Sequence, residues 1–336
     1  MKTNTILVGD ALDRLAELPD DSVDCIVTSP PYFGLRDYGR DGQLGSETSV
    51  DDWVKHLRLV AAELARILTP TGTFWLNVGD SYSSHLSQGA PKKGLLLGPQ
   101  KLAVALADDG WLIRNHAIWA KPNAMPSSVT DRLSNSHEIL LLLTRGPRYY
   151  FDLDTIRVPA ASMRGAQPRK KIAGYPPNSV TPAGGSVDRN RGLDRMKRHG
   201  ANSHPLGKSP GDVWTIPTAA YRGAHYAVYP LGLAERCVLA GCPERVCTAC
   251  GASWRRANRR HDDRLLRTGV LRPQCRCRAE PWRPGLVLDP FVGSGTTAIA
   301  AEKHRREWLG IELNADYARQ ADERITQSRN TTEQQR

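Results

Sequence analysis

Residues 285–297 read Gly-Leu-Val-Leu-Asp-Pro-Phe-Val-Gly-Ser-Gly-Thr-Thr, and this stretch predicts the fold of the chain. Its apolar residues 286–288 are typical of a buried strand. Gly293 and Gly295 then allow a tight turn, at which the backbone can approach a ligand closely. A helix is expected from residue 296 to 303. A strand, a glycine turn and a helix N-terminus in this order form a usual seat for an adenosine-type cofactor.

Strands and helices alternate on both sides of this turn. The hydrophobic pattern predicts further strands at 5–8, 23–27, 73–78, 111–119, 137–143 and 307–312. It predicts helices at 11–18, 51–68, 96–106, 231–239 and 315–327. Ser49 or Asp51 can cap the helix at 51–68, residues 69–72 are expected to end it, and the polar tail from Ser328 is expected to fray. The alternation indicates an α/β fold in which helices cover a sheet.

Two acidic residues accompany the glycine turn. Asp289 ends the first strand, where its carboxylate can pair with a ligand ammonium, and Glu312 ends the next strand, where an acid typically binds ribose hydroxyls. Residues 293–298, Gly-Ser-Gly-Thr-Thr-Ala, also fit the G-x-G-x-x-A fingerprint of dinucleotide sites. An acid just before the glycines would repel a pyrophosphate. The pattern therefore favours a cofactor with a cationic end, such as S-adenosylmethionine, over NAD.

A second short motif, Thr-Ser-Pro-Pro-Tyr at residues 28–32, follows the predicted strand at 23–27. Ligand sites in open α/β sheets lie at the carboxyl ends of strands. The exocyclic amine of a nucleic-acid base is a poor nucleophile, because its lone pair is conjugated into the ring. The Ser29 hydroxyl and the Pro30 carbonyl can accept its N–H groups, and Tyr32 offers a stacking face for a base pulled from its duplex. The motif indicates methyl transfer to such an amine by positioning and desolvation, with a rigid structural turn as the alternative.

Positive charge is concentrated in two segments of the chain. Of the net charge of +11 over 336 residues, 160–212 and 252–283 contribute +7 each, which leaves −3 for the rest. Localised basic surface suits the phosphate backbone of DNA, and solvated loops without a partner are the alternative. No apolar run reaches the roughly 18–20 residues that a membrane helix needs. The first residues lack the pattern of a signal peptide, so a cytoplasmic protein without a membrane partner is expected.

Four cysteines have the spacing of a metal site: Cys247, Cys250, Cys275 and Cys277. The first two form a C-x-x-C pair before a glycine, and the last two can close the site across a 24-residue loop. Four thiolates satisfy tetrahedral Zn²⁺, so the sequence predicts a small structural zinc ribbon that grips DNA phosphate with its arginines. The second pair departs from the commoner C-x-x-C. Cys237 or Cys242 therefore stays open as a substitute ligand, and free thiols are the alternative.

With these motifs the chain resembles the amino-methyltransferases of DNA in the β arrangement, where the catalytic loop precedes the target-recognition region and the cofactor motif comes last. The resemblance covers most of residues 4–150 and 225–325. Residues 28–32 match the catalytic motif, 289–295 match the cofactor motif, and 310–312 look like the ribose-binding stretch. The resemblance implies a Rossmann-like sheet with helices on both faces that uses S-adenosylmethionine, together with a basic recognition insert and a zinc ribbon.

The resemblance also implies roles for individual residues. The implied catalytic residues are Ser29, Pro30, Pro31 and Tyr32. The implied cofactor-binding residues are Asp10, Asp289, Phe291, Gly293, Ser294, Gly295, Thr296 and Glu312. Residues 119–123 and 137–138 resemble blocks that shape the base pocket, and 229–236 resemble the segment under the methionine part of the cofactor. Serine at the position of Ser29 usually accompanies transfer to N4 of cytosine and aspartate usually accompanies N6 of adenine, so cytosine is favoured and adenine is the alternative.

The implied organisation has six segments: a catalytic half at 1–158, a target-recognition insert at 159–224, a return helix at 225–241, the zinc ribbon at 242–284, a cofactor-binding half at 285–327 and a frayed tail at 328–336. Double-stranded DNA is the implied partner and base flipping the implied mode of access. A companion restriction nuclease and a dimer are both allowed. An RNA or free-nucleotide methyltransferase, and a DNA-binding protein that has lost catalysis, remain as other functions.

Overall fold

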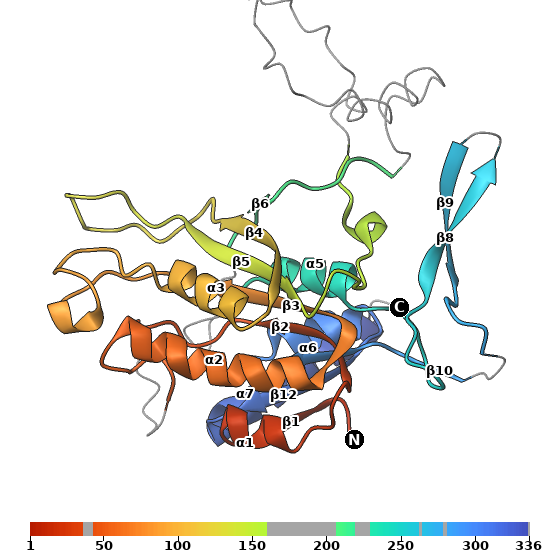
Figure 1. The fold of residues 1–336 in the computed structure, drawn as a ribbon, viewed down its shortest axis with the longest axis horizontal. Coiled ribbons are helices and arrows are strands. Elements are labelled where there is room, and N and C mark those ends of the chain that lie inside the picture. The colour runs from red at the N-terminus through yellow and green to blue at the C-terminus, as the bar shows by residue number, and fades with distance from the viewer. Residues whose placement is uncertain (36–42, 160–205, 219–228, 262–263, 278–280, 335–336) are drawn as a thin grey trace, which may run out of the picture. The chain divides into compact units, whose positions relative to one another are not determined.

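The computed structural model describes residues 1–35, 43–159, 206–218, 229–261, 264–277 and 281–334. The chain divides into one unit of Met1–Asp152 with Asp212–Arg336 and a second unit of Leu153–Gly211. In the first unit, eight strands form one sheet in the order β1-β12-β11-β2-β3-β5-β4-β6 (Figure 1). These strands are β1 (Thr5–Val8), β2 (Val23–Thr28), β3 (Leu68–Val78), β4 (Leu112–Ala120), β5 (His137–Thr144), β6 (Val213–Thr215), β11 (Leu286–Asp289) and β12 (Glu307–Glu312). The α/β fold predicted from the sequence is thereby confirmed.

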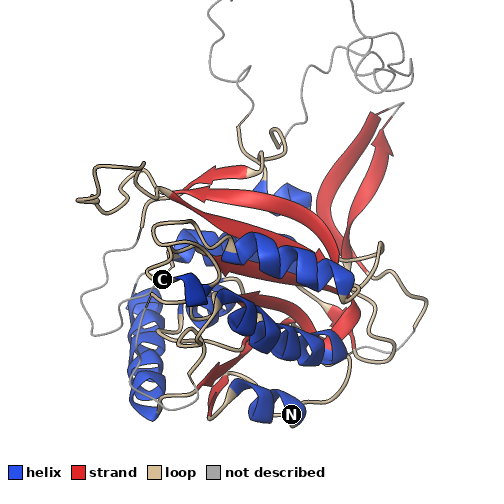
Figure 2. Cartoon of the chain, turned by 60° about the vertical axis from the view of Figure 1, so that its left-hand side comes forward, coloured by secondary structure: helices blue, strands red, loops and turns tan. Residues whose placement is uncertain are grey.

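Helices cover both faces of this sheet (Figures 1 and 2). Helix α2 packs against α1 and α3 on one face, whereas α6 packs against α5 and α7 on the other. The helices are α1 (Ala11–Ala16), α2 (Val50–Ile67), α3 (Gly98–Asp108), α5 (Leu231–Gly241), α6 (Thr296–Lys303) and α7 (Ala315–Gln334). Short 3-10 helices occur at η1 (Leu86–Gln88) and, in the second unit, at η2 (Leu153–Ile156). No helix in the described part of the chain is long and apolar enough to cross a membrane.

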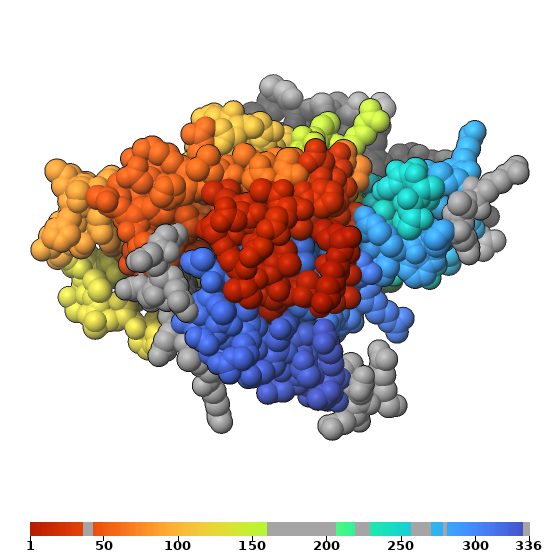
Figure 3. Space-filling view, turned by 90° about the horizontal axis from the view of Figure 1, so that it is seen from below, coloured from red at the N-terminus to blue at the C-terminus, as the bar shows by residue number. Residues whose placement is uncertain are grey.

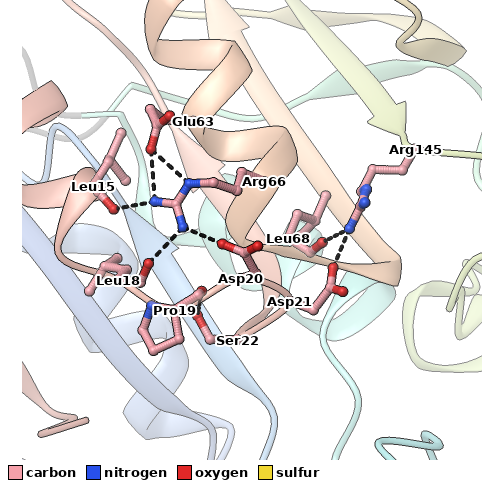
Figure 4. A network of polar contacts seen from close by, with 10 residues as sticks. All are labelled: Leu15, Leu18, Pro19, Asp20, Asp21, Ser22, Glu63, Arg66, Leu68 and Arg145. Carbon is pink, nitrogen blue, oxygen red and sulfur yellow. Dashed lines mark hydrogen bonds and ion pairs between the residues drawn. The ribbon is translucent and has the colours of Figure 1, made fainter.

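Helix α2 shows how the sequence pattern produces this packing. Its eight buried residues recur at helical spacing and press into the core beside Phe74 and Leu141 of the sheet. Of the two predicted caps, Ser49 is the one observed, since its hydroxyl accepts the N–H of Asp52 at 3.1 Å. At the other end, Arg66 donates to the carbonyls of Leu15 and Leu18 (Figure 4). These bonds fasten the connection that leads into β2 and its loop.

The topology places the two ends of the chain side by side. Strand β11 pairs in parallel with β2, with Val287 opposite Cys25 and Leu288 opposite Ile26. On its other side β11 pairs with β12, which pairs in turn with β1. The N-terminal and C-terminal segments accordingly lie against each other in the space-filling view (Figure 3). Because the strands are parallel, the loops that follow them meet at one edge of the sheet.

Two smaller pairs of strands lie between α5 and β11 in the sequence. Strand β7 (Val246–Cys247) pairs with β10 (Trp282–Arg283), and β8 (Arg255–His261) forms a hairpin with β9 (Arg264–Arg272). Both pairs occur within the expected zinc ribbon. Both pairs come before β11 in the chain, so they connect to the sheet where β11 begins. The loops that follow the parallel strands meet at the opposite end of those strands.

Three boundaries differ from the sequence-based expectations. The tail expected to fray from Ser328 continues α7 to Gln334, because Arg329 pairs with Glu302 of α6 and no glycine or proline interrupts it. Residues 69–72 already belong to β3, which begins where α2 ends. The separate unit is Leu153–Gly211, whereas the insert was expected at 159–224, since β6 joins the main sheet through β4. Most of the expected insert, 160–205 and 219–224, lies outside the described residues.

Candidate active site

A hydrogen bond joins the two sequence motifs directly. The Thr28 hydroxyl, at the end of β2, donates to Asp289 Oδ1 at 2.6 Å, at the end of β11. The Thr297 hydroxyl donates to the other carboxylate oxygen of Asp289 at 2.5 Å. The Phe291 N–H and the Tyr229 hydroxyl are further donors, at 3.1 and 3.2 Å. Residues 261 positions apart in the chain therefore share one buried polar centre.

This arrangement shows where Asp289, one of the predicted cofactor residues, lies. Its side chain is only 1% exposed and its oxygens already accept four hydrogen bonds from the protein. Burial raises the pKa of the Asp289 carboxyl, and the surrounding donors oppose that rise. Asp289 thus organises the turn after β11, and its pairing with a ligand ammonium stays a prediction.

A cavity of about 970 Å³ opens at the edge where the loops after β1, β2, β4, β11 and β12 meet. It is large for a small-molecule site, for which about 300–1,000 Å³ is typical. All four predicted catalytic residues line it: Ser29, Pro30, Pro31 and Tyr32. Six predicted cofactor residues line it as well: Asp10, Phe291, Gly293, Ser294, Thr296 and Glu312. One hollow therefore combines both motifs, with room for a cofactor and a planar base.

Gly295 does not line the cavity, contrary to expectation. It has a φ of +78°, and a Cβ atom there would lie 3.0 Å from Ile325 Cδ1 of α7. The glycine is required for the left-handed turn and for close packing of α7, and its contact with a cofactor stays a prediction.

Two acidic residues at the cavity have fixed orientations. Glu312 accepts the Gly293 N–H through Oε2 and the Asn314 N–H through Oε1, each at 3.0 Å. Burial is the main cause that raises the pKa of Glu312. Asp10 caps α1 by accepting the Leu12 N–H at 2.8 Å. Such fixed carboxylates suit the hydroxyl and amine groups of an adenosine, which is the chemistry that the cofactor motif requires.

Ser29 begins a chain of hydrogen bonds that determines where its proton lies. Tyr32 Oη is 2.9 Å from Ser29 Oγ and donates to Glu138 Oε2 at 2.7 Å. Glu138 is also paired with Lys121, which lies 4.6 Å from the centroid of the Trp119 ring. A phenol has one proton, so when Tyr32 gives it to Glu138, Ser29 must donate to Tyr32. The lone pairs of the Ser29 oxygen then face the cavity as acceptors.

Several residues of the site were not identified from the sequence. Asn77 lines the cavity at the end of β3 and donates to the Ile139 carbonyl at 3.1 Å. A polar residue closing an apolar run was the available signal. Tyr229 was assigned to the segment under the methionine part, but its contact with Asp289 depends on tertiary packing. Asn123 lines the cavity and belongs to the block at 119–123 that was expected to shape the base pocket, whereas Met125 lies in an irregular loop that has no periodic signal.

The structure brings the four predicted metal ligands together. The sulfur atoms of Cys247, Cys250, Cys275 and Cys277 all lie within 4.8 Å of one another. The substitutes considered from the sequence, Cys237 and Cys242, are fully buried at α5 instead, where burial raises the pKa of both thiols. The four-cysteine cluster lies beside β7 and β10. These strands come just before β11 begins, whereas the cavity lies where β11 ends, so the cluster is remote from the cavity.

The chain is similar in sequence to known DNA methylases. Residues 23–323 match the family model described as DNA methylase, N6_N4_Mtase. The chain is 34% identical to the type II methyltransferase M.SmaI of Serratia marcescens, an alignment that covers 98% of this chain and 93% of that protein. It is 33% identical to the type II methyltransferase M.Cfr9I of Citrobacter freundii, over 93% of this chain and 84% of that protein.

Solved structures share the fold. The PvuII DNA methyltransferase (cytosine-N4-specific) matches with a TM-score of 0.58 and 17% identity, over 98% of this chain and 92% of that one. A putative DNA modification methylase of Thermus thermophilus, complexed with S-adenosyl-L-methionine, matches with a TM-score of 0.53 and 24% identity, over 96% and 94%. The family match spans most of the sequence, and both of its motifs line one cavity. The chain belongs to the DNA methylase family of N6- and N4-amino methyltransferases.

Proposed function

We propose that this protein is a type II DNA methyltransferase that moves a methyl group from S-adenosylmethionine to the exocyclic amine of a flipped base, N4 of cytosine. The observation that carries the proposal is the cavity that residues of both motifs line. The bond from Thr28 to Asp289 joins the two motifs to each other. A cofactor held by one motif then lies within reach of a base held by the other.

The residues after β11 and β12 fit S-adenosylmethionine. Glu312 would bind the ribose hydroxyls, Phe291 would pack against the adenine, and Asp10, after β1, would lie on the adenine side. The α6 N-terminus and the Gly293 backbone give the close approach that the cofactor needs. When bound, the cofactor supplies an electrophilic methyl group on a sulfonium.

The loop after β2 prepares the amine. Ser29 Oγ and the Pro30 carbonyl accept its two N–H groups, which favours the tetrahedral geometry that the nitrogen needs in order to attack. Tyr32 both stacks the base and, through Glu138, keeps the Ser29 proton away from the amine. No strong base is required, since catalysis arises from positioning and from exclusion of water.

Cytosine is preferred over adenine because of Ser29. The family resemblance associates serine at this position with N4 of cytosine, and a serine hydroxyl is a weaker acceptor than a carboxylate. An N6-methyladenine product would reverse this assignment without changing the reaction class.

Transfer of a labelled methyl group tests the proposal. The purified chain, labelled S-adenosylmethionine and duplex DNA should give labelled DNA, and nucleoside analysis should identify N4-methylcytosine. Unlabelled duplex DNA should compete, whereas RNA and free nucleotides should not. An absence of label in DNA of all sequences would contradict the proposal, and competition by RNA alone would move the substrate class to RNA.

Replacing Glu312 by glutamine is expected to weaken cofactor binding. Loss of a charged acceptor for hydroxyl groups costs about 1.5–3 kcal/mol, or roughly 10–150-fold in the cofactor Kd. Because burial raises the pKa of Glu312 and the hydroxyls bind its ionised form, the wild-type affinity should fall as the pH drops through that raised pKa. Calorimetric titration of Glu312→Gln should show the weaker affinity without this pH dependence. Glu323→Gln, at an exposed position on α7, is the matched control. An unchanged Kd in Glu312→Gln would remove Glu312 from the cofactor site.

The sequence relatives are named type II methyltransferases, which supports a role in restriction-modification. A companion nuclease is part of this proposal. We further propose that both basic segments contact DNA phosphate. In this proposal the arginine-rich hairpin of β8 and β9 contacts duplex that flanks the target base. Arg259→Ser with Arg260→Ser should reduce the salt dependence of DNA affinity by a slope of about 1 per lost phosphate contact. An unchanged slope would exclude the hairpin from the interface.

A further inference from the structure

The region between α5 and β11 holds four thiols in a geometry that methyl transfer does not use. All six distances between the sulfur atoms of Cys247, Cys250, Cys275 and Cys277 are 4.8 Å or less, and none of the four is in a disulfide. Four thiolates around one Zn²⁺, at about 2.3 Å each, have their sulfur atoms about 3.8 Å apart. The cluster is therefore close to the dimensions of a tetrathiolate site.

Two separate strand pairings bring the cysteines together. In the hairpin, Arg255 pairs with Arg272. Cys250 precedes Arg255 and Cys275 follows Arg272, so both cysteines lie at the same end of the hairpin. In the second pair, Cys247 lies opposite Trp282, and the Thr248 hydroxyl donates to the Pro281 carbonyl at 2.5 Å. The two strand pairings together thus bring the four cysteines close to one point.

The first pair of ligands sits on a tight turn. The Gly251 N–H donates to the Cys247 carbonyl at 2.9 Å, and the Cys247 N–H donates to the Ala252 carbonyl at 3.0 Å. Gly251 has a φ of +71°, a conformation that a side chain disfavours. This turn points the sulfur atoms of Cys247 and Cys250 toward a common centre, as in the knuckles that bind zinc.

The described side chains of this region form no hydrophobic core of their own. Among the residues from Thr248 to Pro284 whose burial is described, namely 248–256, 270–277 and 281–284, none is buried. A segment of this size without a core needs a disulfide or a metal to hold one conformation. The four cysteines are the residues placed to provide it.

We propose that Cys247, Cys250, Cys275 and Cys277 bind one structural Zn²⁺ that holds the base of the arginine-rich hairpin in place of a hydrophobic core. Four protein ligands complete a tetrahedral site and leave no position open for substrate, so the metal stabilises structure and takes no part in chemistry. The proposal is independent of the methyltransferase activity, because the cluster and the cavity lie at opposite edges of the sheet.

The structure also predicts how far the effect of the metal extends. Arg283 donates to both carboxylate oxygens of Asp24, at 2.5 and 3.2 Å, and the Leu286 N–H donates to Asp24 Oδ2 at 2.8 Å. These bonds attach the start of β11 to β2 without the metal. Loss of zinc should therefore loosen residues 246–256 and 270–277, while β11 and β12 stay ordered.

Metal analysis of the full-length chain, purified without chelator, tests the site. About one zinc per chain is expected in the wild type, and a thiol reagent should release it as four cysteines react. Cys250→Ser with Cys277→Ser, which changes the two exposed ligands, should lose the metal. Hydrogen exchange should then rise at least tenfold in 246–256 and 270–277 and stay unchanged in β11.

Cys242→Ala is the matched control, since this buried cysteine lies outside the cluster, and it should retain zinc. Wild-type protein that holds less than half an equivalent of zinc even after zinc is added would overturn the proposal. So would retention of zinc by the double variant, or unchanged exchange in 246–256 after the metal is removed. The thiol-release measurement uses the wild type, so misfolding of a variant cannot decide the outcome.

Discussion

Ser29→Ala is expected to lower kcat about 10²–10³-fold while leaving the Kd of S-adenosylmethionine unchanged. The hydroxyl oxygen accepts an N–H of the target amine as the nitrogen becomes tetrahedral, and removal of one such positioned group typically has an effect of this size. Ser29 lines the cavity but lies on the loop after β2, away from the β11 and β12 residues proposed to bind the cofactor. Single-turnover methylation of duplex DNA, with cofactor binding measured separately, gives the two quantities.

Tyr32→Phe makes the same test more specific. It keeps the aromatic face but removes the oxygen that lies 2.9 Å from Ser29 Oγ and donates to Glu138. The Ser29 proton is then free to point into the cavity, so kcat should fall although stacking persists. Ser22→Ala, where the hydroxyl only donates to the Pro19 carbonyl in an exposed turn, serves as the control. Equal losses of kcat and cofactor affinity in Ser29→Ala would exclude Ser29 from the chemistry.

Asp289→Ala is expected to destabilise the protein by about 3–5 kcal/mol and to abolish cofactor binding. The change leaves the buried Thr28 hydroxyl without its acceptor and also removes an acceptor from the Thr297 hydroxyl and from the Phe291 N–H. Each orphaned buried donor costs about 1–3 kcal/mol. The turn after β11 should then lose its conformation, since this carboxylate holds both of its ends. Urea unfolding of the variant measures the loss.

Thr28→Val separates the effect of one bond from that of the whole centre. It removes only the donor from β2 and keeps the side-chain volume, so a loss of about 1–2 kcal/mol is expected. If Asp289 were a ligand for a cofactor ammonium and not an organiser of the turn, Asp289→Ala would weaken cofactor binding without lowering the free energy of unfolding. That result would contradict the structural role assigned to it.

Local pattern was sufficient to predict most of the fold. Strand β12 and helix α6 begin and end at the residues that the sequence indicated, because each apolar run is bounded by charged residues or glycine. The same holds for β1. The predicted end of α7 was wrong, because the ion pair between Arg329 and Glu302 joins two helices and leaves no signal in the local sequence.

The sequence predicted which residues line the site better than it predicted what each of them does. The residue types of the two motifs were enough to identify most of the cavity lining. The burial of Asp289 was not predictable, since it depends on β2 lying beside β11 and on a donor 261 residues away. The link from Tyr32 to Glu138 likewise depends on the pairing of β3 with β5. Side chains whose partners come from distant strands cannot be assigned from spacing along one strand.

A crystal structure of the chain with S-adenosylhomocysteine and a duplex that contains its target base is the most direct test of the central claim, that one cavity holds both reactants. We expect the adenosine against Phe291 and Glu312, and the flipped base against Tyr32 with its amine within hydrogen-bond distance of Ser29 Oγ. The cofactor sulfur should point at that amine. A cofactor bound outside the cavity, or a base that remains stacked in the duplex, would contradict the proposal that one cavity holds both reactants.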